Sequence, residues 1–385
     1  MRDAPETVWL REVAGSVRHT HMHILFCNWR DTRNPEGGGS ERYVESVARG
    51  LVQRGHQVTI ACASHADAPD DETVDGVRFS RRGRKLSVYL RVFIRLLTGR
   101  YGDVDIVVDV QNGLPFFTRW ATRKPVVVLV HHVHREQWPV VYPGLVGRVG
   151  WWIERWLAPR MYRRSRYVAV SESTRQELVG LGVDRERITV VHNGTEPAPA
   201  MSVQRSPTPR IIALGRLVPH KQIEHAIDAI ADLSAQHPDI ALDIVGEGWW
   251  HDELVQHAVD RGVEERVHFH GFVDAVVKHE LLARAWVMVL PSIKEGWGLV
   301  VGEAGHHEVP TVAYASAGGT TESIDHKETG VLVDHPHELT AEIGRLLDDP
   351  EWRELMGRGA REKADLYSWA ASQAAFSAVI EERQT

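Results

Sequence analysis

The chain repeats one short pattern, and this repetition constrains its fold more than any other feature. A short apolar run is followed by a glycine-containing or polar turn, and then by a segment with helical spacing of its apolar residues. Continuous apolar runs of this length are typical of parallel strands whose two faces are both covered by helices. They occupy residues 23–27, 58–62, 105–110, 125–130, 167–170, 188–191, 210–214, 241–245, 267–269, 286–290, 311–314 and 331–333.

A proline-rich segment, residues 197–209, divides these runs into two series. Clusters of proline and small polar residues between periodic segments indicate a linker. Each series alternates strands with helices, which is the pattern of a doubly wound α/β sheet. The sequence therefore predicts two doubly wound, Rossmann-like domains that face each other across an interdomain cleft.

The charge of the chain is divided unevenly between its halves. Residues 1–194 contain 29 Lys and Arg against 21 Asp and Glu, whereas residues 195–385 contain 16 against 31. A basic half and an acidic half indicate two domains with different partners.

The sequence also lacks the features of membrane-spanning and secreted proteins. No apolar run approaches the roughly 20 residues that span a bilayer, and the first 22 residues lack the apolar core of a secretory signal. Two cysteines are too few for a disulfide framework. We expect a cytoplasmic protein.

The stretch from Pro291 to Glu303 carries the densest candidate chemistry. Gly296 and Gly298 have no Cβ, so an anion can approach the backbone closely. If Gly298 begins a helix, free backbone N–H groups and the positive end of the helix dipole point beyond the preceding strand. With the carboxylates of Glu295 and Glu303 beside it, such a turn suits a phosphorylated sugar. An ordinary strand–loop–helix connection with solubilising acidic residues is the alternative.

Further motifs follow one another in a fixed order. They are Gly37-Gly38-Gly39, Arg54-Gly55-His56, Val170-Ser171, His192-Asn193-Gly194, Gly215-Arg216 with Lys221, Gly246-Glu247-Gly248, Gly271, Glu295 with Glu303, and Gly318-Gly319. The ordered set resembles the family 4 retaining glycosyltransferases of GT-B fold, also called glycosyltransferases group 1, from about His23 to Trp369. This resemblance implies that residues 21–196 with 368–385 form an acceptor-side domain, that residues 197–367 bind a nucleotide-diphosphate sugar, and that residues 1–20 are an extension.

The resemblance also assigns roles to single residues. Arg216 and Lys221 match the pair that holds the diphosphate, and two cations there would stabilise the leaving group without a metal ion. Glu303 matches the carboxylate that binds ribose, because an ionised carboxylate accepts hydrogen bonds from vicinal hydroxyls. Glu295 matches the carboxylate beside the transferred sugar. His131 matches a histidine that contacts this sugar, although His132 and His134 are close enough for the register to slip.

The predicted site follows from these matches. Its catalytic residues are His131, Glu295, Arg216 and Lys221, and its other donor-binding residues are Gly38, Gly39, Gly215, Gly246, Val273, Gly296, Trp297, Gly298, Leu299 and Glu303. Trp297 stands where the family usually has Phe and is expected to reshape the sugar pocket. No metal site is expected, because no carboxylate or thiolate set accompanies the three neighbouring histidines. No cofactor is expected, and no residue is an evident general base.

Two stretches, residues 78–101 and 142–167, are rich in arginine and aromatic residues. Basic helices that carry Trp and Leu are candidates for contact with an anionic membrane surface. They predict peripheral membrane binding and a lipid-linked or glycan acceptor, with a small-molecule acceptor as the alternative. Nucleic acid is not an expected partner, since no nucleic-acid-binding motif accompanies the charge. A purely structural explanation is that the tryptophans pack on the sheet and the arginines are solvated.

Two other functions fit the same predicted fold. A sugar synthase or phosphorylase would use a free sugar or a sugar phosphate. A catalytically silent GT-B scaffold would only bind a nucleotide or a membrane, but the intact set of Arg216, Lys221, Glu295 and Glu303 favours an enzyme. Hydrolysis of the donor without an acceptor would discriminate between the enzyme and the scaffold.

Overall fold

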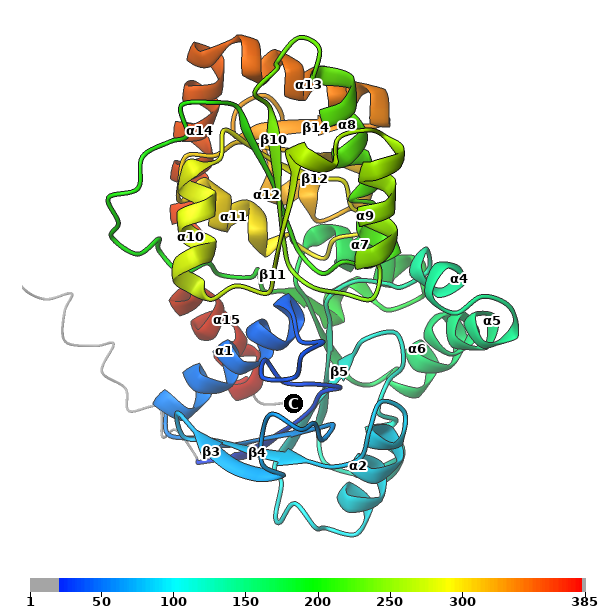
Figure 1. Ribbon diagram of the computed structural model, residues 1–385. Coiled ribbons are helices and arrows are strands. Elements are labelled where there is room, and N and C mark those ends of the chain that lie inside the picture. The colour runs from blue at the N-terminus through cyan, green and yellow to red at the C-terminus, as the bar shows by residue number, and fades with distance from the viewer. Residues whose placement is uncertain (1–20, 383–385) are drawn as a thin grey trace, which may run out of the picture.

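The computed structural model describes residues 21–382, which contain two separate sheets (Figure 1). The strand order of the first is β3-β4-β2-β1-β5-β6-β7-β8, parallel except for the antiparallel pair β3–β4. Its strands are β1 (His23–Cys27), β2 (Gln57–Cys62), β3 (Asp71–Val74), β4 (Val77–Arg81), β5 (Ile106–Gln111), β6 (Val126–Val130), β7 (Arg166–Ala169) and β8 (Ile188–Val190). The predicted extension, residues 1–20, lies outside the described residues.

The second sheet is parallel throughout, in the order β11-β10-β9-β12-β13-β14. It consists of β9 (Arg210–Leu214), β10 (Ala241–Val245), β11 (Val267–Gly271), β12 (Val287–Leu290), β13 (Thr311–Tyr314) and β14 (Gly330–Val333). All twelve apolar runs singled out in the sequence are therefore strands, and the prediction of two Rossmann-like domains is confirmed.

Helices cover both faces of each sheet (Figure 1). Those of the first half are α1 (Gly39–Gln53), α2 (Ser87–Leu97), α3 (Thr118–Ala121), α4 (Gln137–Val141), α5 (Leu145–Trp152), a π-helical turn (Ile153–Leu157), α6 (Ala158–Met161) and α7 (Glu172–Gly180). The second half contains α8 (Glu224–Leu233), α9 (His251–Asp260), α10 (Ala275–Arg284), α11 (Leu299–Gly305), α12 (Thr320–Ser323), α13 (Pro336–Asp348), α14 (Pro350–Asp365) and α15 (Trp369–Glu381). Short 3₁₀ turns lie at Arg185–Arg187, Pro219–Lys221, Glu264–Arg266 and Ala315–Ala317.

The last helix, α15, returns to the N-terminal domain and packs beside α1 (Figure 1). The ring of Phe376 stacks on Phe26 at a centroid distance of 5.8 Å. The Gln373 side chain donates a 3.0 Å hydrogen bond to the carbonyl of Ser46. Phe376 and Phe26 share the apolar core between the first sheet and its helices.

The strand order reverses between β1 and β5 in one sheet and between β9 and β12 in the other. In an open α/β sheet the loops at the carboxyl ends of such strands separate and leave a crevice for ligands. The loops after β1, β6, β9 and β12 all meet between the domains. The predicted site residues lie on these loops or close to them.

The hairpin β3–β4 and the burial of Arg81 are departures from the sequence-based expectation. The turn of this hairpin is Asp75-Gly76, and both residues have positive φ. The strand β3 was not among the strands expected from the sequence. Residues 78–81 are therefore strand and not part of a basic surface helix. The Arg81 side chain is 1% exposed and pairs with Asp31 and Glu72. Arg81 thus supports the loop after β1 and does not belong to a membrane-facing surface.

Candidate active site between the two domains

The glycine-rich turn before α1 forms one wall of the site. Gly38 caps α1 in an extended conformation, and its N–H donates to Glu41 Oε2 at 2.8 Å. A Cβ on Gly38 would lie 3.8 Å from Arg216 Nε, and one on Gly39 would lie 2.9 Å from Leu299 Cδ1. Arg216 and Leu299 belong to the other domain. The turn therefore lies directly against the C-terminal domain, and a side chain at Gly39 would require Leu299 to move.

Arg216 follows β9 and faces the glycine turn. In the part of the chain from 21 to 382, no carboxylate lies within ion-pairing distance of its guanidinium. Burial and the like charge of Arg30 lower the pKa of Arg216, whereas the carboxylate of Glu41 opposes the shift. A guanidinium still binds its proton at neutral pH. Arg216 is thus a partly buried, unpaired cation that is available to an anionic ligand.

Gly215 and Gly246 bring the backbones after β9 and β10 together. A Cβ on Gly246 would lie only 1.9 Å from the carbonyl oxygen of Gly215. Its φ of 134° also disfavours any other residue. The tight contact fixes the strand ends from which Arg216 projects.

Lys221 and Glu295 form an ion pair at the next strand end. Lys221 ends the 3₁₀ turn after β9, and Glu295 lies in the loop between β12 and α11. The backbone of Glu295 is fixed on both sides, because its N–H donates to Ala317 at 2.8 Å and its carbonyl accepts from Gly319 at 3.0 Å. The structure therefore brings the two predicted residues into direct contact.

The turn from Gly296 to Gly298 packs against the N-terminal domain. A Cβ on Gly296 would lie 2.3 Å from the carbonyl oxygen of His131. Gly298 has a φ of 85° and caps α11, as the sequence predicted. The ring of Trp297 is buried and lies 4.7 Å from the rings of both His192 and Tyr367. It therefore packs in the interface between the domains.

Among the three neighbouring histidines, His131 is the one with a buried ring nitrogen that has no hydrogen-bond partner in the described range. Its Nε2 is buried and has no partner among residues 21–382. Burial lowers the pKa of His131 to about 4, so the ring is neutral at pH 7. In contrast, His132 contacts Gln137 at 3.1 Å and His134 contacts Glu154 at 3.2 Å. His131 is the histidine best placed to contact a polar ligand.

Glu303 projects from α11 and is bound by two cations. Its Oε1 accepts from Arg42 of α1 and from Lys278 of α10, each at 2.7 Å. Burial by itself would raise the pKa of Glu303, but the charges of Lys278 and Arg42 outweigh burial and lower it. The carboxylate is therefore ionised and fixed in orientation.

Val273 makes no polar contact with the other predicted residues, among the residues that the structure describes. It follows β11 and packs against an apolar cluster of the C-terminal domain. In the sheet, β10 and β9 separate β11 from β12, which precedes the Glu295 loop. Val273 thus follows a strand that two other strands separate from β12 in the sheet.

The structure also reveals residues that sequence analysis missed. Glu322 of α12 accepts from the N–H groups of Glu172 and Ser173 at the start of α7, both at 2.8 Å. Lys294 pairs with Glu177 of α7. Both contacts join the domains. In the sequence Glu322 lies 150 residues from Glu172, and no local pattern indicates such a pairing.

No cluster of three or more His, Cys, Asp or Glu in the described range is arranged to hold a metal ion. The one Asp-x-Asp sequence of the chain, Asp103 to Asp105, precedes β5 at the end of the sheet opposite the site. Asp105 accepts from the backbone of His23 there, at 2.8 Å. This sequence is therefore unconnected with the site.

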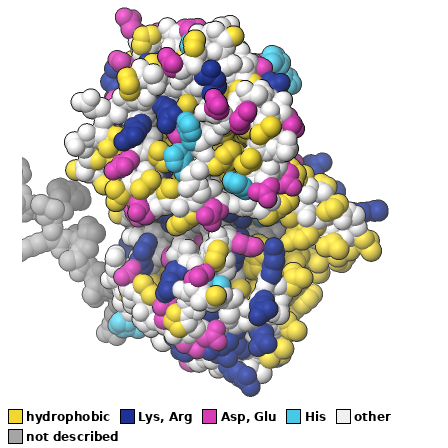
Figure 2. All heavy atoms as spheres, in the orientation of Figure 1, with side chains coloured by type: hydrophobic (Ala, Val, Ile, Leu, Met, Phe, Trp, Pro, Cys, Tyr) yellow, Lys and Arg dark blue, Asp and Glu magenta, His cyan; other side chains and the backbone are white. Residues whose placement is uncertain are grey.

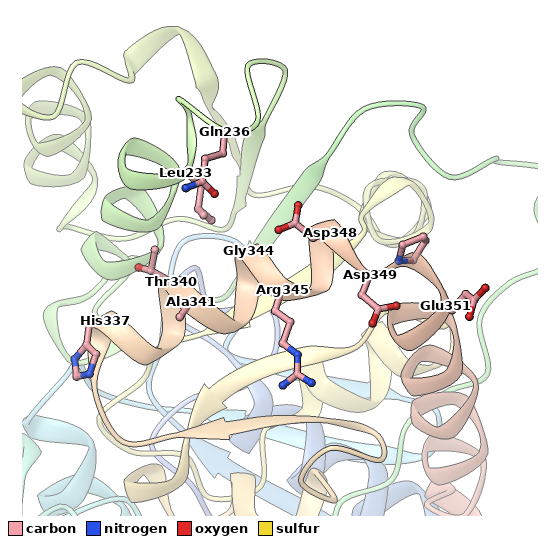
Figure 3. Close-up of a pocket in the computed structure, with 11 residues that line it drawn as sticks. Leu233, Gln236, His337, Thr340, Ala341, Gly344, Arg345, Asp348, Asp349 and Glu351 are labelled. Atoms are coloured by element: carbon pink, nitrogen blue, oxygen red, sulfur yellow. The ribbon is translucent and has the colours of Figure 1, made fainter.

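A shallow groove between α8 and α13 lies on the C-terminal domain, away from the interdomain site (Figure 3). Its side chains are spread along α13, with Leu233 and Gln236 opposite. The Arg345 side chain stacks on Trp352 at 4.2 Å. No set of charged groups converges in this groove, so it is not a candidate for the chemistry.

Comparisons with known proteins match both halves of the chain. Residues 37–198 match the model of Glycosyltransferase Family 4, and residues 198–363 match that of Glycosyl transferases group 1. A GDP-mannose-dependent alpha-(1-6)-phosphatidylinositol monomannoside mannosyltransferase of Mycolicibacterium smegmatis is 30% identical over 379 residues, which is 91% of this chain and 96% of that protein. A D-inositol 3-phosphate glycosyltransferase of Corynebacterium glutamicum is 28% identical, covering 89% of this chain and 91% of its own.

A similar fold is found in a solved structure. HepE of Anabaena, crystallised with UDP and glucose, superimposes with a TM-score of 0.73. The match covers 94% of this chain and all of the other, at 19% sequence identity. At this identity the comparison establishes the fold alone.

Proposed function

Because the chain belongs to the family 4 glycosyltransferases, with the GT-B fold, we propose that it transfers a hexose from a nucleotide-diphosphate sugar with retention of configuration and without a metal ion. The observation that carries this proposal is the position of Arg216. Its unpaired guanidinium faces the glycine turn of the opposite domain, and the Lys221–Glu295 pair lies on the neighbouring strand end. A diphosphate between the domains would satisfy this cation.

The proposed chemistry follows from the charges at the site. When the bond between the sugar C1 and the diphosphate oxygen breaks, the leaving group gains negative charge. Arg216 and Lys221 stabilise that charge, since preorganised donors act strongly in a site that excludes water. The acceptor oxygen bonds to C1 from the same face, and its proton passes to the departing phosphate oxygen. Glu295 and the neutral His131 hold hydroxyls of the transferred sugar, and Glu303 holds the ribose.

The acceptor is proposed to be lipid-linked, on the basis of an exposed apolar ridge on the N-terminal domain. The ridge consists of Leu145, Val146, Val149, Trp152 and Trp156, whose exposed fractions lie between 47% and 74%. Figure 2 shows hydrophobic side chains gathered where Figure 1 places α4, α5 and α6. Exposed apolar surface of this extent marks an interaction site with a protein or a membrane.

Charge favours a membrane as the partner of this ridge. Arg148, Arg155 and Arg160 are exposed on the same helical segment. Each basic residue near an anionic leaflet contributes about 1 kcal/mol to binding. Trp151 is not part of the exposed ridge, because it packs against the core of the N-terminal domain. No helix within residues 21–382 has the length and apolarity needed to cross a membrane. The relative from Mycolicibacterium smegmatis acts on a phosphatidylinositol monomannoside, which agrees with a lipid acceptor.

Thermal unfolding with a panel of UDP-, GDP- and ADP-sugars tests the proposed donor. We expect one nucleotide class to raise the melting temperature, because a ligand at a hundredfold excess over its Kd adds about 2.7 kcal/mol of stability. The matching nucleoside, which lacks the diphosphate, serves as the control and should give little shift. The shift should persist in excess EDTA. A shift that EDTA removes and Mg²⁺ restores would refute metal independence, and no shift with any class would refute the donor proposal.

A further inference from the structure

Arg42 joins three parts of the molecule that move relative to one another if the domains open. It projects from the first turn of α1 in the N-terminal domain. Its Nη1 lies 2.7 Å from Glu303 Oε1 on α11, and its Nη2 lies 3.2 Å from Glu196 Oε2. Glu196 immediately precedes the proline-rich segment that connects the domains. The guanidinium of Arg42 therefore connects α1, the interdomain connection and α11.

The two cations on Glu303 bind the same carboxylate oxygen. Arg42 and Lys278 both donate to Oε1, and no residue in the described range donates to Oε2. The Glu303 side chain is only 9% exposed. Charge-assisted hydrogen bonds are the shorter and stronger kind and fix geometry well. Oε1 is thereby occupied, and Oε2 keeps its capacity to accept hydrogen bonds.

We propose that Arg42 is a positioning residue for the donor: from the opposite domain it holds the ionised Glu303 with Oε2 turned toward the vicinal hydroxyls of the ribose. The inference rests on the proposed role of Glu303 in ribose binding. Because Arg42 and Glu303 belong to different domains, the ribose is held in this way only when the domains are as close as in this structure. Nucleotide binding and domain closure are therefore coupled through Arg42.

Stability alone does not account for the Arg42 contact. The side chain of Arg42 is 32% exposed, and Lys278 still pairs with Glu303 when Arg42 is removed. The domains are also joined by other contacts, among them the pair of Lys294 with Glu177 and the bonds from Glu322 to the start of α7. Loss of Arg42 should thus leave the fold intact, which allows its role toward the ligand to be measured separately.

Calorimetric titration of the full chain with a nucleoside diphosphate and its 2′,3′-dideoxy analogue tests the inference. UDP, GDP and ADP are the probes. The wild-type protein should bind the ribose form about tenfold or more tightly than the dideoxy form, because one charge-assisted hydrogen bond changes the Kd by about this factor. Arg42→Met should remove most of this preference and leave the affinity for the dideoxy form unchanged. Arg42→Lys should restore part of it, and Glu177→Gln, which breaks an interdomain pair away from Glu303, should not alter it.

The Glu303→Gln variant separates failure of this inference from failure of the proposed function. If Glu303→Gln and Arg42→Met each lose the preference and the double variant loses no more, the inference is supported. If Glu303→Gln loses the preference and Arg42→Met keeps it, the positioning role of Arg42 is overturned and ribose binding by Glu303 stands. If both variants keep the preference, ribose binding by Glu303 is wrong, and the inference falls with it.

Discussion

Replacement of Arg216 with Ala is expected to reduce turnover of a nucleotide sugar by a factor of about 100 to 1000, the usual cost of removing one donor that stabilises a developing negative charge. Because Arg216 has no ion-pair partner among residues 21–382, its loss leaves no unpaired carboxylate. The melting temperature of the variant should therefore be close to that of the wild type. The affinity for the nucleotide diphosphate should fall as well, since the proposed contact of the guanidinium with the phosphates is the same before and after transfer.

Lys221→Ala should reduce turnover to a similar extent but differs from Arg216→Ala in its effect on stability. It leaves Glu295, which is half-buried, without its cation. We therefore expect a lower melting temperature for Lys221→Ala than for Arg216→Ala. Arg49→Ala is a suitable control, because Arg49 pairs with exposed Asp75 outside the site. Unchanged affinity for nucleotide diphosphates in both site variants, measured by calorimetry, would show that the diphosphate binds elsewhere.

Replacement of both Trp152 and Trp156 with Ser should weaken binding to anionic vesicles by about tenfold or more, because each apolar side chain that leaves water contributes about 1.5 to 3 kcal/mol when fully buried. The two rings are 55% and 47% exposed, so their loss should not disturb the core. Co-sedimentation with phosphatidylglycerol vesicles measures the effect. Binding by the wild type should also fall steeply as salt rises, since screening shortens the reach of the arginine charges to about 10 Å at 0.1 M salt.

The acidic half of the chain provides a matched control. Trp249 is 64% exposed on the C-terminal domain, and Trp249→Ser should leave vesicle binding unchanged. Arg155→Glu should weaken binding at low salt, because it reverses a charge on the segment that carries the ridge. Failure of the wild-type protein to bind vesicles at low salt would contradict the membrane proposal. The acceptor would then be a soluble molecule.

Strands with both faces buried were predictable because they must be apolar throughout. This holds for β6, whose five residues are all buried, and equally for β12. The hairpin strand β3 was missed for the opposite reason. It is a polar edge strand, Asp71–Val74, and none of its residues is buried. Its available signal was the Asp75-Gly76 turn, since Asp-Gly favours the positive φ values of a tight hairpin.

Local motifs predicted turns such as Gly298 at the start of α11. The pairs that form across the domains were not predicted, because their members are far apart in the sequence. Arg42 and Glu303 are separated by 261 residues, and Lys294 and Glu177 by 117. Arg81 was misplaced for a related reason. An arginine-rich stretch predicts a solvated surface, and only the three-dimensional fold shows that Asp31 and Glu72 surround this one side chain.

NMR observation of donor turnover in excess EDTA tests most directly whether this protein is a retaining, metal-independent glycosyltransferase. The full chain is incubated with UDP-, GDP- and ADP-sugars, with water as the slow acceptor, and the anomeric proton of the first product is recorded before mutarotation. We predict that one donor yields nucleotide diphosphate and a sugar with the anomeric configuration of the donor, and that Arg216→Ala yields neither. An inverted product would contradict retention. A folded protein that releases no nucleotide diphosphate from any donor would contradict the proposal that it is a glycosyl-transferring enzyme of this kind.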